Sequence, residues 1–115
     1  MINKNYVCVI GGAGHVGAPL GLALSSKGYK VILIDKNTKN IKKINHATMP
    51  FIEEGCEQLL KRMISKKKIS ATNKLSEVKK CKYIIICIGT SVNNKFKPNL
   101  KNFINFFYYL KKYLN

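Results

Sequence analysis

The chain has 115 residues, a mass of 13.0 kDa and a formal net charge of +16 at pH 7. This length suffices for one domain but not for two, and a hydrophobic content of 46% excludes wholesale disorder. No apolar run reaches the roughly 18 residues of a membrane span. We therefore expect no membrane association.

The N-terminus and the cysteines indicate the cellular compartment of the protein. Residues 1–5 lack the apolar core of a secretory signal, so we expect none. The four cysteines form no Cys-x-x-Cys pair, and two of them, Cys8 and Cys87, lie in apolar strand-like runs. We expect reduced thiols and a cytoplasmic protein.

The positive charge has two explanations. It could mark a nucleic-acid surface, whose affinity would fall steeply with salt. However, 20 of the 21 basic residues are lysine, and arginine, which makes bidentate phosphate and base contacts, occurs once. The abundance of Lys, Asn and Ile also fits a drift of the genome toward A/T-rich codons. We favour the drift and expect no nucleic-acid partner.

The first third of the chain is predicted to form a strand, a turn, a helix and a second strand. Residues 6–10 are apolar without alternation, as in a strand of a parallel sheet that is buried on both faces, and residues 30–34 form a second strand of this type. A glycine-rich turn over 11–17 leads into a helix over 15–27, which Gly28 ends. The apolar stripe of this helix is Val16, Leu20, Ala23 and Leu24.

The middle of the chain is predicted to add two helices and a short strand. A weaker helix covers residues 38–47, and a second helix covers 53–65. Residues 69–72 form a short strand, and 75–80 form one or two helical turns. In the weaker helix, Ile41 and Ile44 point inward.

The last third contains the most apolar strand, over residues 83–88, then a polar loop over 93–99. A helix capped by Asn99 covers residues 100–114. Its apolar stripe is Leu100, Phe103, Ile104, Phe107, Leu110 and Leu114. The stripe packs on the sheet or, alternatively, docks a partner or a membrane surface. The whole pattern predicts an α/β fold: an incomplete Rossmann-type doubly wound parallel sheet of about four strands with flanking helices.

The glycine turn matches G-x-G-x-x-G between a buried strand and a helix, as in dinucleotide-binding folds. Gly12 allows the sharp turn, Gly14 lets a pyrophosphate approach the backbone, and Gly17 lets the helix pack close to the strands. The free N–H groups of the helix start, at His15 and Val16, face the phosphates. The alternative is an ordinary tight turn, in which His15 is merely exposed.

Asp35 is the only aspartate of the chain and ends the second strand, 18 residues after Gly17. A carboxylate there accepts hydrogen bonds from the ribose hydroxyls and repels a 2′-phosphate, so we predict NAD rather than NADP as the cofactor. Lys36 reaches the same ribose or screens the carboxylate. The alternative is that Asp35 only ends a strand.

Gly89 and Thr90 follow the most apolar strand. In a doubly wound sheet the carboxyl end of that strand faces the same crevice as the glycine turn. We expect Gly89 to allow close approach of the cofactor, and the Thr90 hydroxyl to bond its ribose or phosphate. The alternative is a turn that ends the strand.

Four segments carry a resemblance: residues 9–20, Asp35, residues 49–55 and residues 86–90. Together they resemble the N-terminal NAD-binding domain of the UDP-glucose/GDP-mannose dehydrogenase family, over about residues 5–114. The Pro-Phe-x-Glu-Glu-Gly segment and His15 are nearer to the UDP-N-acetylmannosamine dehydrogenase branch. The resemblance implies an NAD-dependent enzyme of polysaccharide biosynthesis that oxidises the C6 alcohol of a UDP- or GDP-sugar to a carboxylate.

The resemblance also implies that most of the enzyme lies elsewhere. The family's catalytic cysteine lies beyond residue 115, so we assign no catalytic residue and no metal ligand here. Residues 1–115 are then a partial N-terminal NAD-binding domain without the central helix and the sugar-binding domain, inactive alone and homodimeric when full-length. Ser91 stands where the family usually has proline. The alternative is a non-catalytic Rossmann nucleotide-binding module. In either case strand 83–88 is an exposed edge prone to aggregation.

Overall fold

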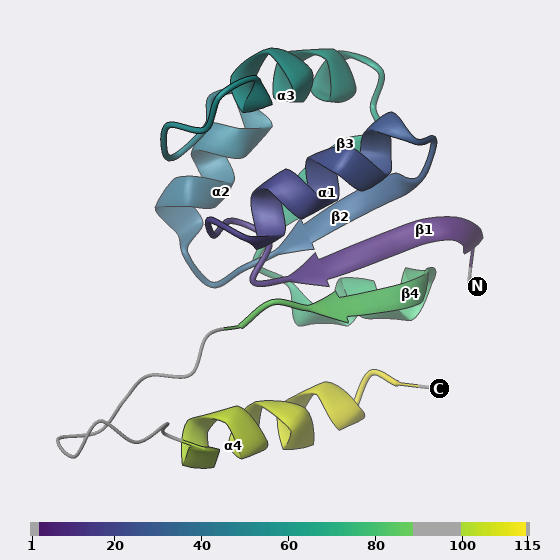
Figure 1. Ribbon diagram of the computed structural model, residues 1–115. Coiled ribbons are helices and arrows are strands. Elements are labelled where there is room, and N and C mark those ends of the chain that lie inside the picture. The colour runs from purple at the N-terminus through teal and green to yellow at the C-terminus, as the bar shows by residue number, and fades with distance from the viewer. Residues whose placement is uncertain (1–2, 89–99, 115) are drawn as a thin grey trace, which may run out of the picture.

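The computed structural model describes residues 3–88 and 100–114. At its centre lies a four-stranded sheet in the order β3-β2-β1-β4, and every neighbouring pair is parallel (Figure 1). The strands are β1 (Asn3–Ile10), β2 (Lys30–Ile34), β3 (Ile69–Thr72) and β4 (Cys81–Ile86). The expected α/β fold with a Rossmann-type sheet is confirmed. The last strand begins and ends two residues earlier than predicted.

Helical segments connect these strands. The helices are α1 (Gly17–Ser26), α2 (Thr38–Asn45), α3 (Cys56–Ser65) and α4 (Leu100–Lys111), and a 3-10 helix, η1 (Leu75–Lys80), precedes β4. The helix predicted over 53–65 begins only at Cys56, because Gly55 adopts a left-handed conformation with φ of +80° at its N-cap. Gly28, with φ of +105°, follows the end of α1 as predicted. The predicted N-cap Asn99 lies outside the described residues.

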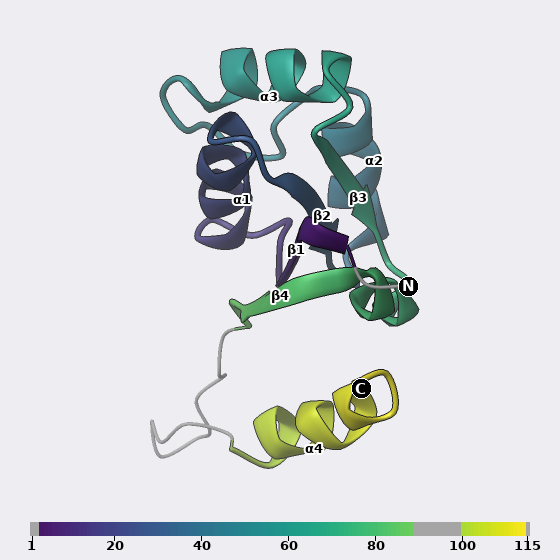
Figure 2. The same ribbon diagram turned by 90° about the vertical axis from the view of Figure 1, so that its right-hand side faces the viewer.

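Two apolar cores lie on opposite faces of the sheet. Odd-numbered residues of β1 and β2, such as Val9 and Leu33, pack with α1, α2 and α3. Even-numbered residues, such as Cys8 and Ile32, pack with η1 and α4. Because β1 is covered on both faces, Val7 to Ile10 are almost completely buried, which explains their unbroken apolar run. Figure 2 shows α4 beyond β4, at the end of the molecule away from α3.

The buried face of α1 differs from the predicted stripe. Val16 is 69% exposed and Ala23 is exposed, so the predicted stripe is wrong at these positions. The helix approaches β2 so closely that small residues must face the sheet: a Cβ atom on Gly21 would lie 2.5 Å from Leu33 Cδ2 and 3.3 Å from Val31 Cγ1. The residues that α1 buries are Gly17, Ala18, Gly21, Leu22 and Ser25.

The predicted stripe of α4 is also wrong in part. Leu110 is 2% exposed and packs into the second core, but Ile104 and Phe107 are 52% and 40% exposed. Leu114 is also about half exposed, and the partly buried neighbours of Leu110 are Phe106 and Tyr113. The helix therefore packs into the second core through one side only, which includes Leu110. The side chains of Leu100 and Phe103 lie outside the described residues.

The predicted inward positions of α2 are confirmed, since both Ile41 and Ile44 are buried. The same helix also covers the free edge of β3. The Asn45 side chain donates from Nδ2 to the Ala71 carbonyl and accepts from the Ala71 N–H at Oδ1, both at 2.9 Å. This pair of bonds replaces a neighbouring strand at that peptide group.

The other edge of the sheet is β4, as predicted, and its Tyr83 side chain is 48% exposed. Among the described residues, no helix is both long and apolar enough to cross a membrane.

Candidate functional site

The glycine turn lies at the carboxyl ends of three strands. The N–H groups of Gly11 and Gly12 both donate to the Ile34 carbonyl, at 2.8 and 3.1 Å, so the turn is tied to the end of β2. Gly11 has a φ of +80°, and a Cβ atom there would overlap the carbonyl oxygen of Cys87, just past β4. The turn therefore sits between β1 and β4, where a doubly wound sheet places its ligand crevice.

The three glycines of the motif differ in what surrounds them. A Cβ atom on Gly12 would lie 2.7 Å from both the Leu33 Cβ and the Val9 carbonyl oxygen, so packing alone requires glycine there. A Cβ atom on Gly14 would meet only the Gly11 carbonyl oxygen, at 3.4 Å, an ordinary contact. Among the described residues, packing does not require a glycine at position 14, so the space beside it is compatible with the predicted approach of a ligand.

The expectation for Gly17 needs correction. A Cβ atom there would overlap the Gly11 carbonyl oxygen and lie 2.9 Å from the Gly12 Cα. Gly17 thus allows the start of α1 to pack against the glycine turn, whereas Gly21 allows the close approach of the helix to β2. The sequence analysis missed Gly21, although a glycine one turn after the motif is a signal for a second close contact.

The start of α1 offers unpaired main-chain donors. The Ala18 N–H donates to the Gly14 carbonyl at 3.0 Å, which begins the helical hydrogen bonding. Within residues 3–88 and 100–114, no oxygen accepts from the N–H groups of His15, Val16 and Gly17. Three adjacent free donors at the positive end of a helix suit an anion such as a pyrophosphate.

Asp35 points toward the glycine turn. Its Oδ2 accepts from the Ala13 N–H and its Oδ1 accepts from the Asn37 N–H, both at 3.0 Å. Each oxygen of an ionised carboxylate has a second lone pair, so both can still accept a hydrogen bond from a sugar hydroxyl. Asp35 is half-buried and Lys36 beside it is exposed. The carboxylate thus bridges the end of β2 and the turn, which a residue that merely ended a strand would not do.

Asn40, on the first turn of α2, joins the same network. Its Nδ2 donates to the Ala13 carbonyl at 3.4 Å, so Asp35 and Asn40 hold Ala13 through its N–H and its carbonyl respectively. The sequence analysis did not find Asn40. Its only signal was a polar residue within one turn of the strand-ending aspartate.

His15 makes a contact that neither expectation included. Its ring is exposed to solvent and stacks on Phe51, with the ring centroids 4.2 Å apart and the planes 30° apart. Phe51 belongs to the segment between α2 and α3, where the Met49 N–H donates to Glu57 Oε1 at 3.1 Å. This segment, which is one of those that carry the family resemblance, therefore lies against the glycine turn.

Gly89 and Thr90 lie outside the described residues. The chain that leads to them runs beside the glycine turn, because the Cys87 N–H donates to the Ile10 carbonyl at 2.7 Å.

The four cysteines differ in burial and in the pKa of their thiols. Cys8 is buried in β1, and a hydrogen bond with Cys81 together with burial raises the pKa of its thiol. The same hydrogen bond lowers the pKa of Cys81, which is buried as the first residue of β4 and does not precede the strand as predicted. Cys87 lies just past β4 and is half-buried, rather than inside a buried strand. Burial raises the pKa of the Cys56 thiol.

No group of three or more His, Cys, Asp or Glu side chains that could hold a metal ion occurs in the described part of the chain.

Comparison with known proteins decides the family. Residues 5–115 match the sequence model of the UDP-glucose/GDP-mannose dehydrogenase family, NAD binding domain. The chain belongs to this family. NAD is its cofactor.

Curated relatives are much longer than this chain. A UDP-N-acetyl-D-mannosamine dehydrogenase from Pyrococcus horikoshii is 32% identical over 82 residues, which cover 71% of this chain and 20% of the relative. A GDP-mannose 6-dehydrogenase from Pseudomonas syringae pv. syringae is 35% identical over 80 residues, 69% of this chain and 18% of the relative. The chain thus spans about a fifth of the length of the relatives that it matches.

Solved structures of this dehydrogenase family share the fold. A ternary complex of GDP-mannose dehydrogenase from Pseudomonas aeruginosa superposes with a TM-score of 0.85 at 27% identity, covering 90% of this chain and 24% of that one. A UDP-D-ManNAc dehydrogenase from Pyrococcus horikoshii superposes with a TM-score of 0.86 at 26% identity, covering 96% and 26% respectively.

Proposed function

We propose that this chain is the NAD-binding portion of a nucleotide-sugar 6-dehydrogenase, which oxidises the C6 alcohol of a UDP- or GDP-sugar to a carboxylate. The observation that carries the proposal is the position of Asp35. Its carboxylate bonds to Ala13 inside the glycine turn, so the proposed ribose acceptor lies against the same turn that carries the free amides of His15, Val16 and Gly17. The relatives are named as dehydrogenases of UDP- and GDP-sugars.

The pyrophosphate of NAD is assigned to the main chain at the start of α1. The N–H groups of His15, Val16 and Gly17 donate to it, and the absence of a side chain on Gly14 lets it approach. Gly12 shapes the turn that presents these groups. The Phe51 ring, stacked on His15, restricts the His15 side chain beside them.

The adenosine ribose is assigned to the carboxyl ends of β2 and β4. Asp35 accepts from its hydroxyls and repels a 2′-phosphate, which favours NAD over NADP. Lys36 lies next to this carboxylate and is exposed, so it can reach the same sugar. We retain Gly89 and Thr90 as cofactor contacts from the segment after β4.

We further propose how this chain relates to the complete enzyme. Residues 1–115 make up part of the N-terminal NAD-binding domain, while the catalytic cysteine and the sugar-binding domain belong to sequence outside this chain. This portion is therefore inactive alone. The complete enzyme is a cytoplasmic homodimer that takes a nucleotide-sugar substrate.

Calorimetric titration of the chain with NAD and NADP tests the cofactor site. We expect NAD to bind more tightly than NADP, and Asp35→Ala to weaken NAD binding at least tenfold, while Lys43→Ala on the exposed side of α2 leaves it unchanged. Equal NAD affinity in the Asp35→Ala variant and the original chain would refute the assignment of the ribose.

A further inference from the structure

A groove of about 280 Å³ opens on the face of the sheet that α1 does not cover. Register places Tyr6, Lys30, Ile32 and Ser70 side by side on this face, from β1, β2 and β3. The Lys80 side of η1 and the loop after α3 form the remaining walls.

Most of the groove lies away from the proposed cofactor site. Lys30 begins β2 and pairs with Tyr6 in the middle of β1, whereas the glycine turn and Asp35 follow the carboxyl ends of these strands. The groove comes nearer to Asp35 at Thr72, the last residue of β3, whose carbonyl accepts from the Asp35 N–H at 3.1 Å. Lys30 and Ile34 are four residues apart, which corresponds to about 13 Å along β2. The NAD proposed above therefore does not account for the groove.

Three lysine side chains give the groove its charge, and neighbouring groups orient two of them. The Lys30 ammonium lies 5.2 Å from the centroid of the Tyr6 ring, and the Lys80 ammonium lies 2.8 Å from Glu77 Oε2. The main chain of Lys67 is held at the end of α3, where its N–H donates to the Ile64 carbonyl at 3.0 Å. Since Glu77 is the only carboxylate of the lining, three ammonium groups and one carboxylate leave a net charge of +2.

Hydroxyl groups face the same space. Ser70 and Thr72 alternate along β3 and so project to one side of the sheet, and both line the groove. The Thr72 Oγ1 already accepts from the Lys74 N–H at 3.2 Å, so its hydroxyl hydrogen is available to donate. The floor contains the buried side chain of Ile32.

We propose that this groove binds a small phosphomonoester, whose phosphate lies between the Lys30 and Lys67 ammonium groups and accepts from the hydroxyls of β3. A phosphomonoester carries a charge of about −1.5 to −2 at pH 7, which the net charge of the lining balances. Lysine binds phosphate as a point charge, and the groove volume lies just below the range for drug-sized ligands, which begins at about 300 Å³, so the ligand must be small.

The test is calorimetric titration of the chain with inorganic phosphate, glucose 6-phosphate and glucose. Saturating NAD is added so that the glycine turn does not contribute. We expect both phosphates to bind and glucose not to bind. The double variant Lys30→Ala/Lys67→Ala should weaken phosphate binding at least tenfold, and Ser70→Ala should weaken it about twofold by removing one hydroxyl of β3.

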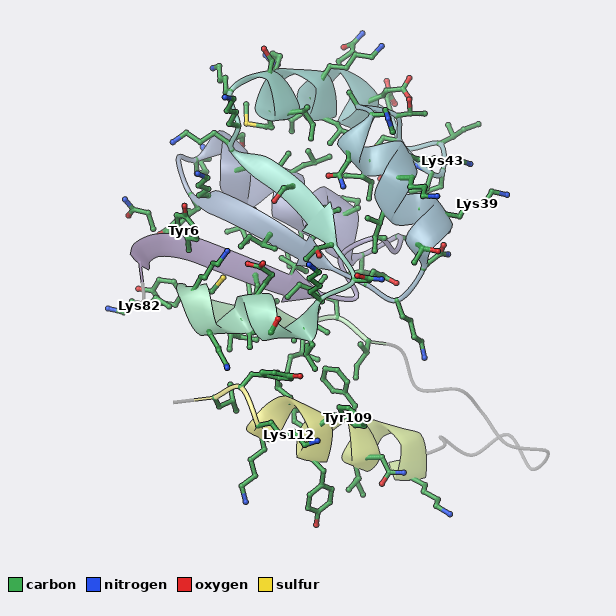
Figure 3. All side chains as sticks on the ribbon, turned by 180° about the vertical axis from the view of Figure 1, so that it is seen from behind. Tyr6, Lys39, Lys43, Lys82, Tyr109 and Lys112 are labelled. Carbon is green, nitrogen blue, oxygen red and sulfur yellow. The ribbon has the colours of Figure 1, made fainter. Side chains whose placement is uncertain are left out.

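The matched control is Lys43→Ala/Lys112→Ala, which removes the same charge from α2 and from the end of α4. Figure 3 shows Lys43 on the opposite side of the molecule from Tyr6, and Lys112 beside α4 at the lower end. Phosphate binding should change less than twofold in this control. NAD binding measured on each variant shows that it is folded.

The two phosphate probes also distinguish the source of the ligand. Tighter binding of glucose 6-phosphate supports a sugar phosphate whose organic part lies on the groove floor, and equal affinities support a site for free phosphate. Three results would overturn the proposal: no phosphate binding, equal losses in the two double variants, or binding of a single-stranded oligonucleotide in place of both phosphates.

Discussion

Substitution by alanine should affect different properties at two glycines of the same turn: stability at Gly17 and cofactor binding at Gly14. In Gly17→Ala the new methyl group overlaps the Gly11 carbonyl oxygen and lies 2.9 Å from the Gly12 Cα, and neither backbone atom can move without disturbing the turn. In Gly14→Ala the methyl group meets only the Gly11 carbonyl oxygen, at 3.4 Å, and otherwise enters the space assigned to the pyrophosphate. The first change should therefore damage the fold, and the second should damage cofactor binding.

The magnitudes follow from the two environments. Overpacking costs about 1–3 kcal/mol, and because the Gly17 methyl group meets backbone we expect about 2 kcal/mol or more from Gly17→Ala. The better helix propensity of alanine offsets at most about 1 kcal/mol. For Gly14→Ala we expect the free energy of unfolding to stay within about 1 kcal/mol of that of the original chain. Alanine also lowers the conformational entropy of the unfolded chain, which contributes a small stabilisation. Its NAD affinity should fall at least tenfold, or about 1.4 kcal/mol.

Thermal unfolding and NAD calorimetry on the same two variants measure both effects. Each kcal/mol shifts the Tm by roughly 4 °C or more in a domain of this size. With a net cost of about 1 kcal/mol or more, Gly17→Ala should melt at least about 4 °C lower. Gly14→Ala should melt close to the original chain. The reasoning is refuted if Gly14→Ala binds NAD normally, or if Gly17→Ala is as stable as the original chain.

Three further changes test the packing around the site. Asn45→Leu leaves the outward peptide group of Ala71 unpaired and should lower the free energy of unfolding by about 1–3 kcal/mol, measured by urea denaturation. Leu110→Ala should cost about 2–5 kcal/mol, and Ile104→Ala on the same helix should stay within about 0.5 kcal/mol; equal costs would contradict the packing of α4. Cys8, buried and with a raised thiol pKa, should react with iodoacetamide at pH 8 only after unfolding, so its rapid labelling in the folded chain would argue against its burial.

Much of the cofactor crevice could be predicted from local sequence. Strand 30–34 has the predicted bounds, because a central strand needs an apolar run and Asp35 follows its last residue. Strand 69–72, at the edge of the sheet, also has the predicted bounds. The direction of the Asp35 carboxylate toward the turn also follows from its place at the end of a parallel strand beside β1. The assignment of NAD contacts to particular residues remains a prediction.

What the sequence could not show depends on contacts between distant segments. The stacking of Phe51 on His15 joins residues 36 positions apart, and nothing near either residue in the chain indicates it. The Asn45 bonds to Ala71 arise because α2 lies along the edge of β3.

The amino-acid sequence by itself determined the order of strands and helices, the glycine turn and the single carboxylate at the end of β2, because these depend on backbone conformation and hydrophobic periodicity over a few residues. Only the tertiary structure decided which face of α1 and α4 is buried. Side-chain hydrophobicity predicts that a helix packs, but the distance to its neighbour decides which residues fit. Gly21 faces β2 because the helix lies too close for a larger side chain, and α4 packs through Leu110 while Ile104 on the same helix is exposed.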